Sequence, residues 1–129
     1  PEKKITINIL NRKITVLYRS SSIVWFNFID ICGFGRSQLD YIEIASLFDT
    51  IFLSGLNIMN SQDDDMVKPF ISLVDEFYDR KINLIILSED DINNLYKGNI
   101  LKFDFKRTLS RLREMKTKEY LREFDKNVF

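Results

Sequence analysis

The stretch Phe70-Ile-Ser-Leu-Val-Asp75-Glu-Phe-Tyr78-Asp79-Arg80-Lys-Ile82-Asn-Leu-Ile-Ile-Leu87 decides the fold class of this chain. In its first part, the apolar side chains recur at helical spacing, which predicts an amphipathic helix. They are Phe70, Leu73, Val74, Phe77 and Tyr78. Pro69 suits the first turn of a helix and disrupts the interior, so we expect this helix to begin near Lys68. Residues 82–87 then form a continuous apolar run of strand length.

A second short apolar strand is predicted before this helix, at residues 49–54. Strand, helix and strand in this order predict a βαβ unit, whose parallel strands are buried on both faces. Upstream, Ser37 is a suitable N-cap for a helix over residues 38–47. Leu39, Ile42 and Ala45 fall on one side of this predicted helix.

The start of the chain predicts antiparallel β structure. Isoleucines alternate with polar residues over positions 5–9, and the alternation resumes over positions 14–18, after a turn at Asn11-Arg12. Residues 23–28 predict a third strand, and Gly33 and Gly35 indicate a loop. The fold class is therefore α/β, in a single domain of 129 residues with a β-hairpin region (1–28) and an α/β region (37–129).

The last quarter of the chain is predicted to contain a short helix at residues 91–96, an extended segment at 101–105 and a final helix from Arg107 to about Arg122. On that helix Arg107, Ser110, Arg111 and Glu114 fall on one polar face. A different stripe can be buried, and it consists of Leu109, Leu112 and Met115. A face with two guanidinium groups is either a solvated surface or a binding surface.

Composition excludes several kinds of chemistry. The chain has no histidine and one cysteine, Cys32, which removes histidine-dependent catalysis, histidine zinc sites and a disulfide framework. The 19 basic and 19 acidic residues balance, and the basic excess over residues 102–122 is too scattered to predict nucleic-acid binding. No apolar run has the length of a membrane span. The acidic run at residues 63–65 fits a helix N-terminus or a solvated loop better than a metal site.

The sequence has no G-x-x-x-x-G-K-[ST] motif, so this chain contains no P-loop of its own. Four co-linear stretches nevertheless resemble one family of ATPases. These are Val24-Trp25-Phe26 through Cys32, then Arg36-Ser37-Gln-Leu-Asp40-Tyr41-Ile-Glu-Ile-Ala45, then Phe70 through Arg80, and finally Phe105-Lys-Arg107-Thr108-Leu-Ser110-Arg111-Leu-Arg-Glu114-Met115. In order and spacing, from about Arg12 to Leu121, the chain resembles the ZapE and AFG-one-like AAA+ ATPases of bacteria and mitochondria.

The resemblance implies that this chain is the C-terminal part of an AAA+ P-loop NTPase. The Walker A, Walker B and first sensor motifs of the family lie upstream of this part, so ATP hydrolysis by this chain alone is not expected. ATP and Mg²⁺ are the cofactors implied for the full-length protein. The family pattern also has two arginines before the phenylalanine equivalent to Phe70, and here those places hold Lys68 and Pro69.

The function implied by the resemblance is that of a nucleotide-driven machine. Bacterial members are cytoplasmic ATPases associated with cell division and the FtsZ ring, whereas mitochondrial members are linked to protein turnover. The bacterial form is the nearer one, because the loop before the Phe103 segment is short. The implied partners are the upstream ATPase domain, FtsZ or another client protein, and further copies of the same protein.

Two hypotheses for the site follow. In the first, Arg107 and Arg111 sense nucleotide, because the planar fork of arginine grips phosphate in two places, and Glu114 orients one of them beside Ser110. In the structural alternative, Arg111 and Glu114 pair with Asp75 or Asp79 on the neighbouring helix.

A different class of function is a protein-interaction module, in which the N-terminal hairpins offer an edge or an aromatic surface to a client. For protein contacts the candidate residues are Arg36, Asp40, Tyr41, Asp75 and Tyr78.

Overall fold

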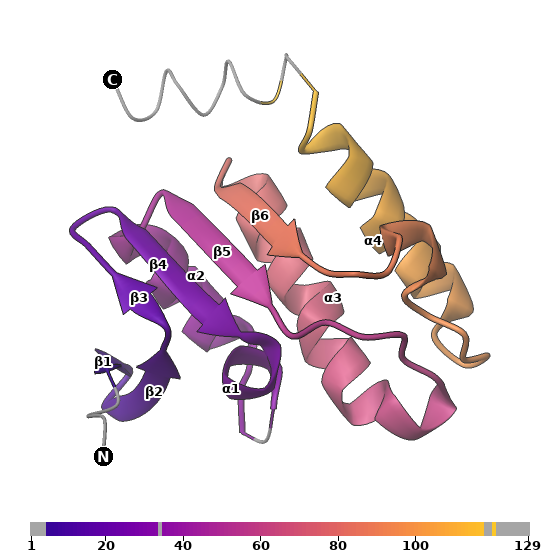
Figure 1. Cartoon of the computed structure of the whole chain (residues 1–129), viewed down its shortest axis with the longest axis horizontal. Coiled ribbons are helices and arrows are strands. Elements are labelled where there is room, and N and C mark those ends of the chain that lie inside the picture. The colour runs from indigo at the N-terminus through magenta and orange to yellow at the C-terminus, as the bar shows by residue number, and fades with distance from the viewer. Residues whose placement is uncertain (1–4, 34, 118–119, 121–129) are drawn as a thin grey trace.

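A computed structural model of the chain describes residues 5–33, 35–117 and 120. Its centre is a four-stranded sheet in the order β3-β4-β5-β6 (Figure 1). The strands β4 (Ile23–Asn27), β5 (Thr50–Ser54) and β6 (Asn83–Leu87) are parallel neighbours, and β3 (Tyr18–Arg19) extends the sheet antiparallel to β4. The predicted βαβ unit is therefore present, with β5 and β6 as its strands.

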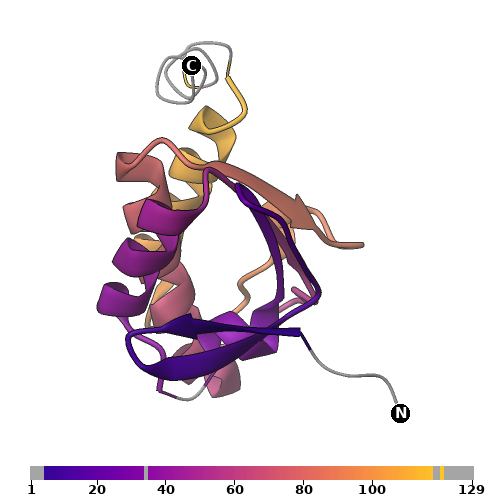
Figure 2. The ribbon, with the colours of Figure 1, turned by 90° about the vertical axis from the view of Figure 1, so that its left-hand side faces the viewer.

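The helices that connect these parallel strands are α1 (Phe28–Cys32), α2 (Gln38–Leu47) and α3 (Asp64–Asp79). All three lie on the same side of the sheet (Figure 2). This placement follows from the single preferred hand of a crossover between parallel strands. Residues 5–33, 35–117 and 120 contain no helix with the length and apolar character that crossing a membrane requires.

The strand at residues 23–27 links the predicted hairpin region to the α/β region, because it pairs antiparallel with β3 and parallel with β5. Val24 and Phe26 are fully buried on the side that faces the helices. The apolar run alone could not show that this strand pairs with the distant β5 as well as with the preceding strand. The structure adds α1, where the sequence indicated only a loop.

A separate two-stranded hairpin is formed by β1 (Ile5–Ile9) and β2 (Arg12–Val16). Its turn consists of Leu10 and Asn11, both with positive φ angles of 52° and 65°, as two-residue hairpin turns favour. The predicted turn was one residue late. The inward-facing side chains are all buried, namely Ile7, Ile9, Ile14 and Val16.

The pair Arg12–Asp40 ties the hairpin to α2. Both carboxylate oxygens of Asp40 accept from Nη2 of Arg12 at 2.7 Å, and the backbone N–H of Ser37 donates to the same carboxylate at 2.8 Å. The contact orients α2 so that Asp40, Tyr41 and Ile44 are buried. Of the side predicted to be apolar, Leu39 is 65% exposed, whereas Ala45 packs partly buried against the core.

The boundaries of the later elements also differ from the prediction. Helix α3 begins at Asp64, after a 3₁₀ turn at Ser61–Asp63, so Pro69 lies inside the helix. The start is fixed by a reciprocal cap in which Asn60 N–H donates to Asp63 at 3.0 Å and Gln62 N–H donates to Asn60 at 3.1 Å. This cap outweighs the local preference of proline for a first turn.

The prediction of an extended segment at residues 101–105 is wrong, because helix α4 spans Lys102–Glu114. The helix starts early because Phe105 is buried and stacks on Phe70 and Tyr96, with ring centroids 6.1 and 5.3 Å apart. The short helix predicted at residues 91–96 is a 3₁₀ turn at Ile92–Asn94. The prediction of one helix from Arg107 to about Arg122 is wrong, because α4 ends at Glu114 and residues 115–117 form a turn; Arg122 itself lies outside the described residues.

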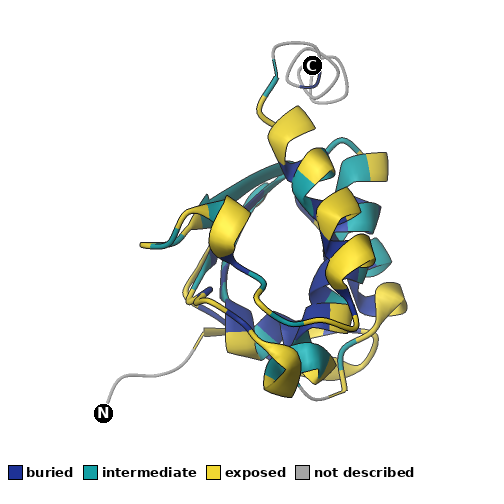
Figure 3. Ribbon diagram, turned by 90° about the vertical axis from the view of Figure 1, so that its right-hand side faces the viewer, coloured by how far each residue is buried: buried dark blue, intermediate teal, exposed yellow. Residues whose placement is uncertain are grey.

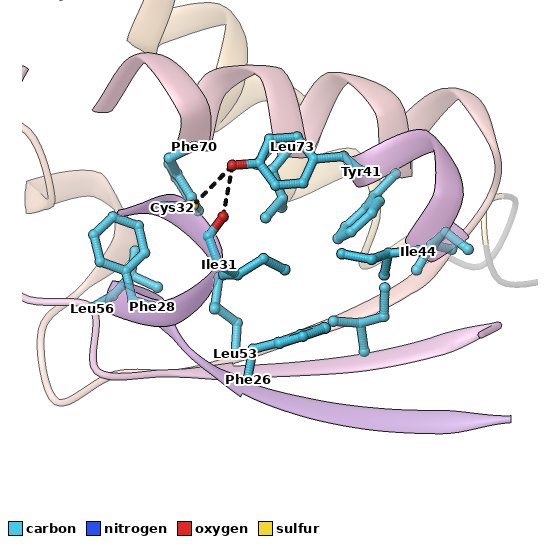
Figure 4. Packing of buried hydrophobic residues seen from close by; sticks show 14 of the residues in the cluster. Phe26, Phe28, Ile31, Cys32, Tyr41, Ile44, Leu53, Leu56, Phe70 and Leu73 are labelled. Carbon is cyan, nitrogen blue, oxygen red and sulfur yellow. Dashed lines mark hydrogen bonds between the residues drawn. The ribbon is translucent and has the colours of Figure 1, made fainter. Parts of the chain in front are cut away.

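Tyr41 and Cys32 form a buried polar contact inside the apolar core (Figure 4). The Tyr41 hydroxyl donates to the Ile31 carbonyl oxygen at 2.8 Å and lies 3.8 Å from Cys32 Sγ. Burial raises the pKa of the Cys32 thiol from 9.0 to about 12, and it is also the main cause of the raised pKa of Tyr41. Both groups are therefore held neutral by the fold.

This burial predicts a loss of stability in alkali. The unfolded chain releases the Cys32 proton near pH 9.0, but the folded chain holds it up to about pH 12. The contribution of Cys32 is thus complete below pH 9.0 and declines above it, by at most about 1.4 kcal/mol per pH unit. Urea unfolding of the wild type and Cys32→Ala between pH 7 and about pH 11 measures this effect. The variant should show the shallower decline, and equal slopes would contradict the assignment.

Candidate functional site

Helix α4 lies along α3 at the β6 side of the sheet (Figure 1). Phe105, Thr108, Leu112 and Met115 are its buried positions near this contact. Burial of Leu112 and Met115 confirms two of the three predicted apolar positions, and Leu109 is half-buried. The buried hydroxyl of Thr108 donates to the Asp104 carbonyl oxygen at 3.2 Å, so the helix satisfies it internally.

Five side chains form a polar group across the two helices, here called the α3–α4 polar cluster. Its members are Asp75, Tyr78, Arg107, Arg111 and Glu114. Asp75 Oδ2 accepts from Arg107 Nη2 at 3.2 Å, and Asp75 Oδ1 accepts from Arg111 Nη1. One carboxylate is therefore shared by the two guanidinium groups that the sequence singled out.

Tyr78 occupies the second half of the α3–α4 polar cluster. Its hydroxyl donates to Glu114 Oε2 at 2.5 Å, and this hydrogen bond is the main cause of its raised pKa. The guanidinium of Arg111 lies 5.3 Å above the centroid of the Tyr78 ring, a cation–π distance. Arg111 is thus held by a carboxylate and an aromatic ring, and Glu114 contacts Tyr78 at this site.

The two arginines differ in exposure. The Arg107 side chain is 54% exposed and the Arg111 side chain 28%. A guanidinium has five N–H donors, so an arginine with one carboxylate oxygen at 3.2 Å retains donors for another anion. Ser110 is exposed on the same helix. Arg107 is therefore the more available cation of the pair.

The other candidate residues have different surroundings. Asp40 and Tyr41 are fully buried, and they hold the hairpin and α1 through the contacts described above. Arg36 Nε donates to the Asp30 carbonyl oxygen at 2.9 Å, which closes the loop after α1. Of the predicted interaction residues, only Asp75 and Tyr78 meet the arginines of α4. No pattern in the sequence indicated that Asp75 would bind both arginines, since Asp75 and Asp79 were equally plausible partners.

Lys68 is exposed on α3, seven residues before Asp75. That spacing places the two residues on the same side of the helix, about 10 Å apart along its axis. Pro69 is half-buried on the neighbouring side. Lys68 therefore places a cation on the side of α3 that holds the α3–α4 polar cluster.

The acidic run at residues 63–65 lies at the N-terminus of α3. Asp63 caps the preceding turn, and Asp64 accepts from the Tyr96 hydroxyl at 2.9 Å. Within residues 5–33, 35–117 and 120, no three histidine, cysteine or acidic side chains converge as a metal site would require. The groups best suited to an external ligand are the guanidinium donors of α4, which suit phosphate.

Removing the shared carboxylate should loosen α4. We expect Asp75→Asn to lower the free energy of unfolding by about 1 kcal/mol, because two charge-assisted contacts are lost at a partly exposed site. The matched control is Asp79→Asn on the exposed end of the same helix, with an expected change within about 0.5 kcal/mol. Urea unfolding of both variants measures the difference. Equal effects would show that the shared pairing contributes nothing specific.

The comparisons with known proteins agree on one family. Residues 1–124 match the family described as AFG1-like ATPase. The chain is 36% identical over 121 residues to the cell division protein ZapE of Escherichia coli K12, covering 94% of this chain and 32% of that protein. It is 28% identical to an uncharacterized protein of Schizosaccharomyces pombe, covering 94% of this chain and 33% of that protein.

A vertebrate relative is more distant. Lactation elevated protein 1 homolog B of Danio rerio is 24% identical over 146 residues, covering 88% of this chain and 29% of that protein. No solved structure matches the chain. The chain spans about a third of the length of the curated relatives it matches. A match over nearly the whole chain confirms the resemblance seen in the sequence, and the chain belongs to the AFG1-like ATPase family.

Proposed function

We propose that this chain is the regulatory and coupling part of a larger AAA+ P-loop ATPase. Its family consists of AFG1-like ATPases, and the relatives are about three times as long as the part they share with this chain. The chain has no P-loop motif, so the phosphate-binding loop belongs to another part of the full-length protein. ATP and Mg²⁺ are bound there, and hydrolysis does not occur in this part alone.

The cellular role proposed for the full-length protein is in bacterial cell division, in the cytoplasm. The support is the similarity to ZapE, whose name describes it as a cell division protein. Division proteins such as FtsZ and further copies of the ATPase are the corresponding partners.

The observation that carries the mechanism is the shared carboxylate of Asp75. Arg107 and Arg111 bind the same group, and Arg107 is 54% exposed. Phosphoryl transfer needs cations positioned against the charge that develops on the γ-phosphate, and arginine provides a planar fork for this task. Arg107 is therefore proposed to exchange its contact with Asp75 for a phosphate oxygen of nucleotide bound by the ATPase part.

Arg111 has a positioning role in this proposal. Asp75 and the Tyr78 ring hold its guanidinium, and Glu114 fixes the Tyr78 hydroxyl. The firmly held Arg111 keeps α4 on α3 while Arg107 changes partner. Ser110, exposed on α4, offers a further hydroxyl donor near the bound phosphate.

The test uses the full-length protein with Arg107→Ala. We expect ATP turnover to fall on the order of tenfold or more, because a phosphate-contacting arginine is lost. Arg107→Lys should recover little of this activity, since a lysine cannot provide the bidentate fork. Steady-state ATPase assays measure turnover, and urea unfolding should show a stability change within about 0.5 kcal/mol.

Arg113→Ala is the matched control, because Arg113 is an exposed arginine of α4 whose guanidinium donates to Asn93. Its turnover should equal that of the wild type. Wild-type turnover in Arg107→Ala, at wild-type stability, would eliminate the sensing role of this residue.

A second function, client binding by the N-terminal hairpin, is favoured by one observation. Within the described residues, β1 and β2 pair only with each other, so both strands have a free edge. Leu10 at the turn is 47% exposed and Ile5 is 46% exposed. An exposed edge with apolar side chains can accept an extended segment of another protein.

This second function predicts that the 129-residue chain binds its client without nucleotide. In a pull-down with purified FtsZ, the chain should retain the partner, and Leu10→Asp should weaken binding several-fold by placing a charge at the contact. Lys13→Asp, at an exposed position of β2, is the charge-change control. Absence of binding by the chain alone would contradict this function.

A further inference from the structure

Among the described residues, no helix lies against the outer face of the four-stranded sheet. Figures 2 and 3 show α2, α3 and α4 on one side and the bare sheet on the other. Alternate side chains of each strand point to this outer face, because Val24, Phe26, Ile51 and Leu53 point into the core. In register across the three parallel strands, the central outward row is Trp25, Phe52 and Ile85.

The centre of the outer face is apolar. It contains a shallow hollow of about 360 Å³ lined by Tyr18, Ile23, Trp25, Phe52 and Leu87. The Trp25 and Phe52 rings contact each other at a centroid distance of 6.4 Å. The indole N–H of Trp25 donates to Ser54 Oγ at 3.0 Å, so the polar atom of the indole is already satisfied within the sheet. None of the described residues that line this hollow is charged.

A bare apolar face is unusual for parallel strands. Parallel sheets are normally covered on both faces, because their connections and neighbours bury both rows of side chains. The inner face obeys this rule, with Ile51 and Leu53 fully buried. The outer row is only half-buried, since Trp25, Phe52 and Ile85 are all of intermediate exposure. Exposed patches of this kind mark interaction surfaces.

We propose that the outer sheet face, defined by Tyr18, Ile23, Trp25, Phe52 and Leu87, docks against the ATPase part of the same polypeptide. This inference rests on the proposed function, in which the chain is one part of a longer ATPase. The part of the Escherichia coli relative that aligns with this chain makes up only 32% of that protein, so about two thirds of the relative lies outside the aligned part.

The position of β1 supports an occupant from the same polypeptide. Figures 2 and 3 both place the start of β1 on the sheet side of the molecule, away from the helices. Chain that precedes this strand in a longer relative can therefore reach the outer face without crossing the helical layer.

The chemistry of the outer sheet face favours a permanent contact over an exchanging client. Permanent interfaces are more apolar than transient ones, and their composition resembles that of a domain core. Aromatic side chains without charged neighbours fit that description. The same sheet carries α3 on its inner face, so docking here would link the ATPase part to the α3–α4 polar cluster through one rigid layer.

The test is thiol accessibility in the full-length protein, on a background without other reactive cysteines. Phe52→Cys places a thiol on the outer sheet face. Phe103→Cys is the matched control, because Phe103 is a phenylalanine of α4 that is 82% exposed. The thiol at position 52 should react with a maleimide at least about tenfold more slowly than the thiol at position 103. If Phe52→Cys does not fold, Leu87→Cys on the same face, 42% exposed at the end of β6, gives the same readout.

The occupant is identified with a short thiol-to-amine cross-linker and mass spectrometry of a mixture of isotopically heavy and light protein. Cross-links from position 52 to the ATPase part within one chain support the proposal. Cross-links that join heavy and light chains would contradict the proposal and show that the outer sheet face contacts a second copy of the protein. Equal reactivity at positions 52 and 103, without cross-links, would overturn it. These readouts need no ATP turnover, so they are independent of the Arg107→Ala result.

Discussion

The parallel pairing of β4, β5 and β6 in sequence order is the constraint on which the rest of the structure depends. With both crossovers of the same hand, α1, α2 and α3 must lie on one face of the sheet. Helix α3 buries one side against this sheet, and its other side becomes the support for α4. That second side carries Asp75 and Tyr78, which is why the arginines of α4 meet a carboxylate and an aromatic ring there. The same constraint leaves the outer sheet face bare.

Long-range polar contacts set the details that the sheet leaves open. Arg12 and Asp40 are 28 residues apart, and their pairing fixes both the position of the hairpin and the rotation of α2. A buried carboxylate of this kind needs its partner, because an unpaired charge in the core is costly. The pair therefore specifies geometry, whereas burial of the apolar side chains provides most of the stability.

The elements that periodicity defines well could be predicted from the sequence. The strand–helix–strand unit, the helix at residues 38–47 and the polar face of α4 are present in the structure. The errors occur where a distant contact outweighs a local preference. The Asn60–Asp63 cap starts α3 before Pro69. The stacking of Phe105 on Phe70 makes α4 begin earlier in the chain than predicted, and the Arg12–Asp40 pair leaves Leu39 exposed.

For the site, the helical spacing of the sequence placed Arg107 and Arg111 on one face of a helix. Only the packing of α4 on α3 could select Asp75 as their common partner. The alternation of side chains in one strand cannot show whether a sheet face is covered, so the half-buried outward row at Trp25 was not predicted.

In the proposed function, the α3–α4 polar cluster responds to nucleotide that the ATPase part of the full-length protein binds. Amide hydrogen exchange of that protein, with and without a non-hydrolysable ATP analogue and Mg²⁺, tests it most directly. We expect changed protection in α4 around Arg107 and in α3 around Asp75, with the β1–β2 hairpin unchanged. Identical exchange in α3 and α4 with and without bound nucleotide would contradict it.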